Sequence, residues 1–508
     1  MKRFSILAML IVAFFTTIAQ NPGDFDPTFG TNGTQMFAPA GSSFVQGFAL
    51  CQMPDGRFIT AGRTRVGNSW QVYVSRHNND GSLDNSFGQN GIAIFNPTNY
   101  IHYAYDVAYY DVLDKIIVLG YCYNAALDTP YPFLMCLNSD GSLCNEFADN
   151  GFSMINDEHP MVPRRMTIHE EMIYWGGYRD DLACVARFYP DGNLDTSFGD
   201  GGYSIFLNEQ ISESSNVEDI ILQPDGKIIA GSWCIHDGNE YDAVVVRLNN
   251  DGSLDESFGE GGYCMYDIND NIDFLMAIAL QEDGKIVAGS HYGIFDPAIN
   301  VRYGVAATRI TADGQLDDSF GEGGFAKAEY TLGQNYCGGV VVGEDGQVFL
   351  GCYAIGHESG KQRMFVAGFT ADGQLNSSFG TNGFTVFGSE AEAAENECHD
   401  FLMQPDGMLV AFGHEFHNGI MTRIYSGVIT ETEENTVDGI LSVYPNPVVD
   451  VLYFDMESEG VAMVYDMMGH QVLSTNVNGS LNVASLPQGT YFIEVIGESE
   501  TLKARFVK

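Results

Sequence analysis

Oxygen-bearing side chains lie close together in one short segment of the chain. The run Asn249-Asn-Asp-Gly-Ser-Leu-Asp255 places them at alternating positions of a predicted loop. Hard cations such as Ca²⁺ bind oxygen ligands in this arrangement, although the segment lacks the distal bidentate Glu of a complete EF-hand loop. Asp251 and Asp255 are therefore candidate calcium ligands. The alternative is that they cap turns by accepting hydrogen bonds from nearby groups.

A second group of candidate residues combines aromatic rings with histidines. Tyr and Trp rings stack on sugars or pack against proteins, and their polar ends form hydrogen bonds. The candidates are expected in the loops that follow the third strand of each repeated unit, which would gather around one rim. They are Tyr121, Tyr123, Trp233, His236, Tyr241, His291, Tyr292, Tyr353, His357, His414 and Phe416. The offsets of these histidines differ from segment to segment, which argues against a shared histidine metal cluster. The alternative for the whole group is that the rings cover sheet edges.

Motifs of common enzyme chemistry are absent from the sequence. It contains no HExxH pair, no phosphate-cradling glycine loop and no recognisable pairing of a nucleophile with a base. The acidic pairs Glu170-Glu171 and Asp180-Asp181 could serve a glycosidase, which works with two carboxylates. In a chain this acidic, such pairs are usually solvated surface. The sequence therefore favours a protein without catalytic activity and leaves a polysaccharide-active enzyme as the alternative.

The charge of the chain limits its partners. There are 67 acidic and 23 basic side chains, which gives a formal net charge of −44. Such a chain repels nucleic-acid phosphates and anionic lipid head groups, so cations or neutral polymers such as glycans remain as partners. The ten cysteines include no CxxC pair, so neither a zinc site nor a redox motif is indicated and no pairing is assigned.

The N-terminus predicts export. Met1-Lys2-Arg3 is basic, the run from Phe4 to Phe15 is apolar, and Thr17-Ile18-Ala19 offers the small residues that a signal peptidase reads. The apolar run is shorter than the roughly 20 residues that a membrane anchor requires. We therefore predict a signal peptide over residues 1–19 and no transmembrane segment in the mature chain.

An internal repeat dominates the remainder of the sequence. The segment Asp80-Gly-Ser-Leu-Asp-Asn-Ser-Phe-Gly-Gln-Asn-Gly91 returns in six further full, weak or truncated copies. The Phe residues of the copies are Phe29, Phe87, Phe147, Phe198, Phe258, Phe320 and Phe379, which gives a mean period of about 58 residues. A second motif, typified by Pro224-Asp-Gly-Lys227, alternates with the first. The chain is therefore built from seven similar units.

Each unit resolves into four strands. In the period after Gly202 they are expected at 203–206, 217–222, 227–230 and 243–248, with an Asp-Gly turn between the second and third. A four-stranded sheet cannot bury both of its faces alone, so seven of them stack around an axis and close into a propeller. The run from Thr34 to Phe37 precedes the first complete unit, and we expect it to complete the last blade and close the ring.

These residues resemble a known repeat family. The pattern DG-x-LD-x-SFG-x-x-G followed by PDGK is similar to the delta-60 repeat propellers over roughly residues 23–430. The resemblance implies a propeller in exported bacterial proteins and implies no established activity. The third repeat departs from the pattern, with Cys144 for Asp and Ala148 for Gly.

The C-terminal segment has a different pattern. Alternating apolar residues separated by Pro, Asn and Gly turns predict a small β-sandwich. The order of its motifs resembles the type IX secretion sorting domain, through Tyr444, Pro445, Asn446, Pro447, Gly469, Gly489 and Tyr491. That resemblance implies the type IX secretion machinery as a partner, and a secreted or outer-surface location in a Gram-negative bacterium.

The sequence thus predicts an all-β chain of four parts. They are the signal peptide at 1–19, a seven-bladed β-propeller at 20–428, a polar linker at 429–438 and a C-terminal sorting β-sandwich at 439–508. The favoured function is a binding or adhesion module that recognises glycan or protein. The alternatives are a glycosidase or lyase with carboxylates in the propeller channel, and a structural adhesion protein without a discrete ligand.

Overall fold

The computed structural model describes most of the chain from residue 20 onward. The described residues are 20–98, 100–124, 126–127, 129–155, 159–207, 212–236, 240–269, 271–297, 300–356, 361–389, 395–428, 439–440, 443–444, 448–454, 460–465, 471–496 and 501–508. The predicted signal peptide and linker lie outside them. The chain divides into two compact units, Met1–Thr430 and Glu431–Lys508. Among the described residues, no helix is long and apolar enough to cross a bilayer.

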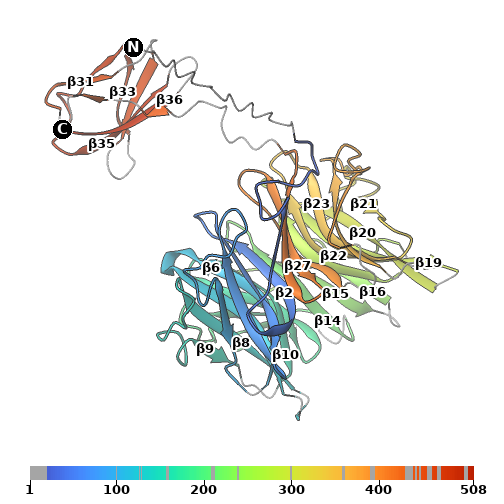
Figure 1. The fold of residues 1–508 in the computed structure, drawn as a ribbon. Coiled ribbons are helices and arrows are strands. Elements are labelled where there is room, and N and C mark those ends of the chain that lie inside the picture. The colour runs from blue at the N-terminus through green and yellow to red at the C-terminus, as the bar shows by residue number, and fades with distance from the viewer. Residues whose placement is uncertain are drawn as a thin grey trace, which may run out of the picture. The chain divides into compact units, whose positions relative to one another are not determined.

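The first unit consists of seven four-stranded antiparallel blades (Figure 1). The first four blades are β2 (Ser42–Gln52), β3 (Phe58–Val66), β4 (Ser69–His77) and β5 (Ile92–Phe95); β6 (Ile101–Tyr110), β7 (Lys115–Asn124), β8 (Thr129–Asn138) and β9 (Phe152–Met154); β10 (Met161–His169), β11 (Met172–Arg179), β12 (Leu182–Phe188) and β13 (Tyr203–Ile205); and β14 (Ser215–Leu222), β15 (Ile228–His236), β16 (Glu240–Leu248) and β17 (Tyr263–Tyr266). A short 3-10 helix, η1 (Asp111–Leu113), joins β6 to β7.

The remaining blades follow the same order. They are β18 (Asp273–Leu280), β19 (Ile286–Asp296), β20 (Asn300–Ile310) and β21 (Phe325–Ala328); β22 (Gln334–Val342), β23 (Val348–Ile355), β24 (Gln362–Phe369) and β25 (Phe384–Phe387); and β26 (Asn396–Met403), β27 (Met408–Glu415) and β28 (Asn418–Tyr425), whose fourth strand is β1 (Thr34–Phe37).

The ring closes through the N-terminal strand, as the repeat phase predicts. Thr34 pairs with Thr422 and Phe37 with Gly419, so β1 is the outer strand of the last blade. The innermost strands contact one another in chain order, and β26 contacts β2 to complete the circle. Figure 1 shows β2, in blue, beside β27, in orange. The all-β propeller expected from the sequence is therefore present.

The repeated Phe-Gly motif joins neighbouring blades. All seven phenylalanines are at least 97% buried. The N–H of the following residue donates to the carbonyl of the next repeat, as in Gly30 to Asp80 at 2.7 Å. Ala148, which replaces Gly in the third repeat, also has positive φ and donates to the Asp191 carbonyl at 2.9 Å, so the turn survives the substitution.

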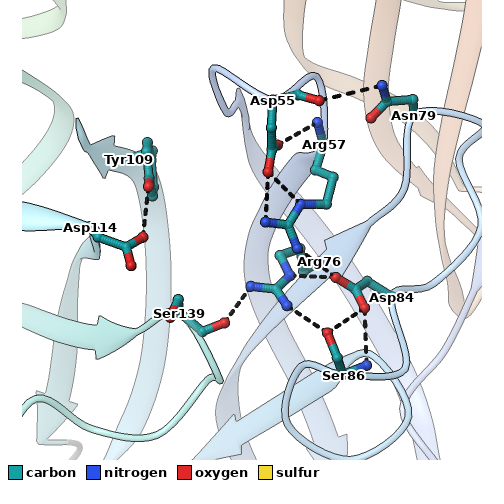
Figure 2. Close-up of polar contacts among 9 residues, drawn as sticks. All are labelled: Asp55, Arg57, Arg76, Asn79, Asp84, Ser86, Tyr109, Asp114 and Ser139. Atoms are coloured by element: carbon teal, nitrogen blue, oxygen red, sulfur yellow. Dashed lines mark hydrogen bonds and ion pairs between the residues drawn. The ribbon is translucent and has the colours of Figure 1, made fainter. Parts of the chain in front are cut away.

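A largely buried ion pair reinforces five of these junctions. Figure 2 shows the pair formed by Arg76 and Asp84. Arg76 Nε donates to Asp84 Oδ2 at 2.8 Å, and Arg76 also donates to Ser139 O in the next blade. The same guanidinium lies 5.0 Å from the Phe87 ring centroid. The corresponding pairs are Arg187–Asp195, Arg247–Asp255, Arg309–Asp317 and Arg423–Asp26. Cys136 and Cys144 occupy these positions in the second blade, where both members of the pair are replaced.

The C-terminal unit contains two sheets around one core. One sheet has the order β29-β36-β35-β32-β33 and the other β30-β31-β34. Their strands are β29 (Gly439–Ile440), β30 (Val443–Tyr444), β31 (Val451–Phe454), β32 (Gly460–Tyr465), β33 (Gln471–Val477), β34 (Ser480–Asn482), β35 (Thr490–Ile496) and β36 (Thr501–Val507). Leu452 and Leu481 of the smaller sheet pack in the same cluster as Val464 and Val495 of the larger one, as in a β-sandwich.

Candidate functional site

Each innermost strand of the propeller carries a β-bulge at an equivalent position. In β2 the pairing register shifts between Gly47 and Ala49, and the other six inner strands shift in the same place. A bulge leaves one residue unpaired and redirects its side chain. The seven bulge residues are Phe48, Tyr105, Arg164, Glu218, Met276, Gly338 and His399. We call them the bulge ring.

The bulge ring borders a single cavity of about 280 Å³, which we call the ring cavity. All seven members line it, and Tyr336 and Tyr353 add two further aromatic walls. None of the seven positions repeats a side chain, whereas the Phe-Gly motif is nearly invariant along the same chain. Residues that the blade structure requires recur in every repeat. The bulge residues differ in every blade, so the blade structure does not dictate their side chains.

Aromatic contacts shape one side of the ring cavity. The Phe48 ring lies 5.3 Å from Tyr105 and 5.1 Å from His399, measured between centroids. Tyr121 stacks on Tyr105 at 5.7 Å. Burial is the main cause that raises the pKa of Tyr121, so this phenol stays protonated at neutral pH. Phe48 and Tyr105 therefore give the ring cavity an aromatic wall, with Tyr121 packed behind Tyr105.

A charged pair faces these rings. Arg164 Nε lies 3.6 Å from Glu218 Oε2, and Arg164 Cζ lies 5.2 Å from the Tyr105 centroid. Glu218 Oε1 accepts hydrogen bonds from Trp233 Nε1 at 2.9 Å and from Asn216 Nδ2 at 2.6 Å. The negative charge of Glu218 raises the pKa of Arg164. The pair supplies fixed donors and acceptors beside an apolar wall, a common composition of ligand pockets.

A second cavity, of about 690 Å³, is lined by the residue that follows the bulge in six of the seven inner strands. We call it the carboxylate cavity because Asp106, Asp219 and Asp400 line it together with Arg165. Arg165 borders both cavities. Its Nη1 atom lies 3.3 Å from Asp400 Oδ2 and 3.8 Å from Asp106 Oδ1. The sequence reasoning missed these residues. For two of them the sequence carries a signal, a distance of five residues before the second repeat motif, at Asp219 before Pro224 and at Asp400 before Pro405. Asp106 lies seven residues before the degenerate motif that begins at Leu113.

The three aspartates also join blades. Asp106 accepts from the Met166 N–H, Asp219 from the Ile278 N–H at 2.8 Å, and Asp400 from the Leu50 N–H at 2.7 Å. Each donor belongs to the following blade. Burial raises the pKa of Asp106 to about 7 and that of Asp219 to about 6. All three carboxylates therefore have a structural role, and burial raises the pKa of Asp106 and of Asp219 toward neutrality.

The predicted ligand-binding residues lie mostly on strands. Five of them belong to strands that extend further than the sequence suggested: Tyr121, Trp233, Tyr241, His291 and Tyr353. His291 and Tyr353 line the ring cavity, and Tyr121 stacks on Tyr105, which also lines it. Trp233 donates to Glu218 of the cavity and contacts Tyr241. Tyr123, His236, Tyr292 and His414 are also in strands, and Phe416 is in a turn. The side chain of His236 and the whole of His357 lie outside the described residues. Tyr292, His291 and His414 are buried.

The calcium candidates have partners within the chain. Asp251 Oδ1 accepts from Ser253 N and Oγ at 3.0 and 2.6 Å, which is an Asx-type turn cap. Asp255 Oδ2 binds Arg247 Nε and Lys227 Nζ, both at 2.7 Å. Two of the chain's own cations therefore already neutralise Asp255, and the geometry favours the capping alternative.

The described sorting residues lie in the C-terminal unit. Tyr444 is half exposed on β30, whereas Tyr491 is buried and its hydroxyl donates to Pro487 O at 2.9 Å. Gly489 and Lys508 exchange two backbone hydrogen bonds, which fixes the end of the chain. Pro445, Asn446, Pro447 and Gly469 lie outside the described residues.

Several solved structures are similar to the chain at low sequence identity. Sqt1 from Chaetomium thermophilum is 11% identical, with a TM-score of 0.37, and the match covers 76% of this chain and 98% of that one. The β-propeller domain of the Trilobed protease from Pyrococcus furiosus is 8% identical, with a TM-score of 0.40 and coverage of 78% and 97%. A polysaccharide lyase, PL25 ulvan lyase, is 11% identical, with a TM-score of 0.45 and coverage of 77% and 96%. Similarity this low says nothing about a ligand.

Two sequence families match parts of the chain. The domain of unknown function (DUF5122) beta-propeller matches residues 54–87, 114–147 and 223–258. The secretion system C-terminal sorting domain matches residues 442–508. No curated protein sequence matches the chain. The chain is therefore a secreted or outer-surface protein of a Gram-negative bacterium, built from DUF5122 beta-propeller repeats and a type IX secretion C-terminal sorting domain.

Proposed function

We propose that the propeller is a glycan-binding module whose ligand occupies the ring cavity. The observation that carries this proposal is the bulge ring. Seven equivalent positions hold two aromatic rings, a cation, a carboxylate, a thioether, a glycine and an imidazole around one cavity. Such asymmetry within a symmetric frame suits recognition of one ligand in one orientation.

The chemistry of the cavity favours a neutral sugar. Phe48 and Tyr105 offer flat apolar surface, while Arg164 and Glu218 offer a donor and an acceptor for hydroxyl groups. A volume of about 280 Å³ is at the small end of ligand sites, which suits one terminal sugar unit rather than an internal stretch of polymer. The net charge of −44 disfavours polyanionic glycans.

The test is a glycan array probed with the full chain, followed by calorimetric titration of the best oligosaccharide. Phe48→Ala and Tyr105→Ala should each weaken binding about five- to tenfold, because each removes stacking surface worth about 1–1.4 kcal/mol. Phe295→Ala is the matched control, since Phe295 is 68% exposed and does not line the ring cavity. Equal affinity of all three variants, or no array signal, would reject the proposal in favour of protein recognition or of a structural role.

A polysaccharide-active enzyme is the second candidate, and one observation favours it. Asp106 and Asp219 have pKa values near neutrality and line a cavity of about 690 Å³, as a carboxyl that acts as general acid would. This candidate predicts release of reducing ends or unsaturated products from a polysaccharide. Asp106→Asn should then abolish the release, whereas Phe295→Ala should leave it unchanged.

A further inference from the structure

Three side chains with metal-binding groups converge in the last blade. Glu397 and His414 are direct cross-strand partners of β26 and β27. His399 follows Glu397 by two residues and is the bulge residue of β26. Each offers one ligand atom, and these atoms all lie within 4.8 Å of one another.

The separations suit a single ion. His399 Nε2 lies 3.0 Å and His414 Nε2 lies 3.8 Å from Glu397 Oε2. A tetrahedral ion with bonds of about 2.0–2.1 Å holds its ligand atoms about 3.3 Å apart, so small side-chain rotations are enough to reach that geometry. The two imidazole rings are stacked at 5.3 Å, which leaves both Nε2 atoms on the side of the carboxylate.

His414 provides an independent indication of a missing partner. Its side chain is fully buried, yet neither ring nitrogen has a hydrogen-bond partner among the described residues. His399 Nε2, in contrast, has the Glu397 carboxylate 3.0 Å away. Buried polar atoms in native proteins nearly always have a hydrogen-bond partner. A buried imidazole nitrogen that lacks one can instead coordinate a metal ion.

We propose that Glu397, His399 and His414 bind one divalent transition-metal ion of the Zn²⁺ type. Two imidazoles and one carboxylate form a donor set that zinc accepts in sites with three protein ligands, whereas Ca²⁺ and Mg²⁺ prefer oxygen ligands alone. His399 also lines the ring cavity, so the proposed ion would lie beside that cavity. A hydroxyl oxygen of a ligand in the cavity could then complete the coordination.

The site also separates this blade from the other six. None of the other bulge residues is a histidine, and none combines with a carboxylate and a histidine in this way among the described residues. The metal site is therefore a property of one blade and not of the repeat. It does not depend on the identity of any glycan.

The experiment is calorimetric titration of the chelator-treated full chain with ZnCl₂, without a histidine tag and under reducing conditions. The wild type should bind about one ion per chain. Glu397→Gln and His399→Gln should each lower the affinity at least about tenfold. Both side chains are about one quarter exposed, so these variants should fold. His159→Gln is the matched control, because it removes an exposed histidine that pairs with Asp180 elsewhere.

A second measurement guards against zinc capture by the ten cysteines. Zn²⁺ should raise the melting temperature of the wild type and of His159→Gln, since an ion that binds only the native state stabilises it. The rise should be absent in the Glu397→Gln, His399→Gln double variant. Absence of saturable binding in the wild type, or unchanged binding in the double variant, overturns the proposal. Because no glycan is present in either measurement, failure here is distinct from failure of the proposed glycan site.

Discussion

Arg423 Nε donates to Asp26 Oδ2 at 2.7 Å, although 397 residues separate the two in sequence. In the other four blades that carry this ion pair, the partners are eight residues apart. Arg423 also donates to Asn79 O of the first blade and lies 4.7 Å from the Phe29 ring. The repeated junction between blades is therefore also the closure of the ring.

Breaking this pair should destabilise the whole propeller. Arg423→Met leaves Asp26 buried without its cation, which costs on the order of 3 kcal/mol of unfolding free energy. Denaturant unfolding followed by fluorescence measures the change. Asp55→Asn is the control, because the side chains of the Arg57–Asp55 pair are 30% and 49% exposed, and surface pairs contribute less than about 1 kcal/mol. A similar loss in both variants would mean that the closing pair has no special role.

The second blade permits a charge-restoration test. Cys136 and Cys144 stand where other blades place Arg and Asp, and both are buried. Cys136→Arg or Cys144→Asp alone should destabilise by about 3 kcal/mol or more, because each buries an unpaired charge. The double variant should recover most of that loss, since the neighbouring Phe147 and turn have the same arrangement as in the other blades. A double-mutant cycle in reducing buffer measures the coupling, and purely additive losses would contradict the prediction.

Asp106 should give the stability a distinctive pH dependence. Burial raises its pKa from 3.8 to about 7, and Arg165 opposes that rise without cancelling it. The folded protein thus holds this proton more tightly than the unfolded chain. The contribution of Asp106 is fully present below about pH 4 and is lost as the pH rises through 7. The stability of the wild type relative to Asp106→Asn should therefore fall between pH 4 and 7 in urea titrations.

Asp195 serves as a control, because its contribution to folding stability should depend on pH in the opposite direction to that of Asp106. Burial alone would raise its pKa, but hydrogen bonds from Ser197, Tyr189 and Arg187 together lower it to about 2. Its contribution is present above about pH 4 and is lost as the pH falls toward 2. Asp195→Asn should therefore change the profile only in the acid range. A change in the same range for both variants would show that the two carboxyls do not titrate as described.

A matched pair of glycines separates backbone strain from steric contact. Both Gly67 and Gly81 have positive φ, at +60° and +83°. A Cβ at Gly67 meets nothing within 4 Å, whereas at Gly81 it would lie 2.7 Å from Phe29 Cζ in the preceding junction. Gly67→Ala should cost about 1 kcal/mol, from the left-handed conformation alone. Gly81→Ala should cost at least twice as much in denaturant unfolding, because overpacking adds about 1–3 kcal/mol, and equal losses would contradict that.

Much of the propeller follows from local signals. Asp-Gly pairs supply the positive φ that hairpin turns need, and apolar runs between them define four strands for each period. The phase of the first Phe-Gly motif also predicts that Thr34–Phe37 closes the last blade, and its pairing with β28 confirms this. The strand ends were less predictable. Trp233 and Tyr353, expected in loops, lie on strands because tertiary pairing extends β15 and β23 beyond their apolar cores.

The sequence by itself determined the number of blades, their order and the export signals, because these depend on turn chemistry and on motifs that are contiguous in the chain. Only the tertiary structure decided which side chains meet at the centre. Glu218, Arg164 and His399 come from three different blades, and nothing in their local sequence marks them as neighbours. They converge because each inner strand bulges at the same point and closure of the ring brings those points around one axis.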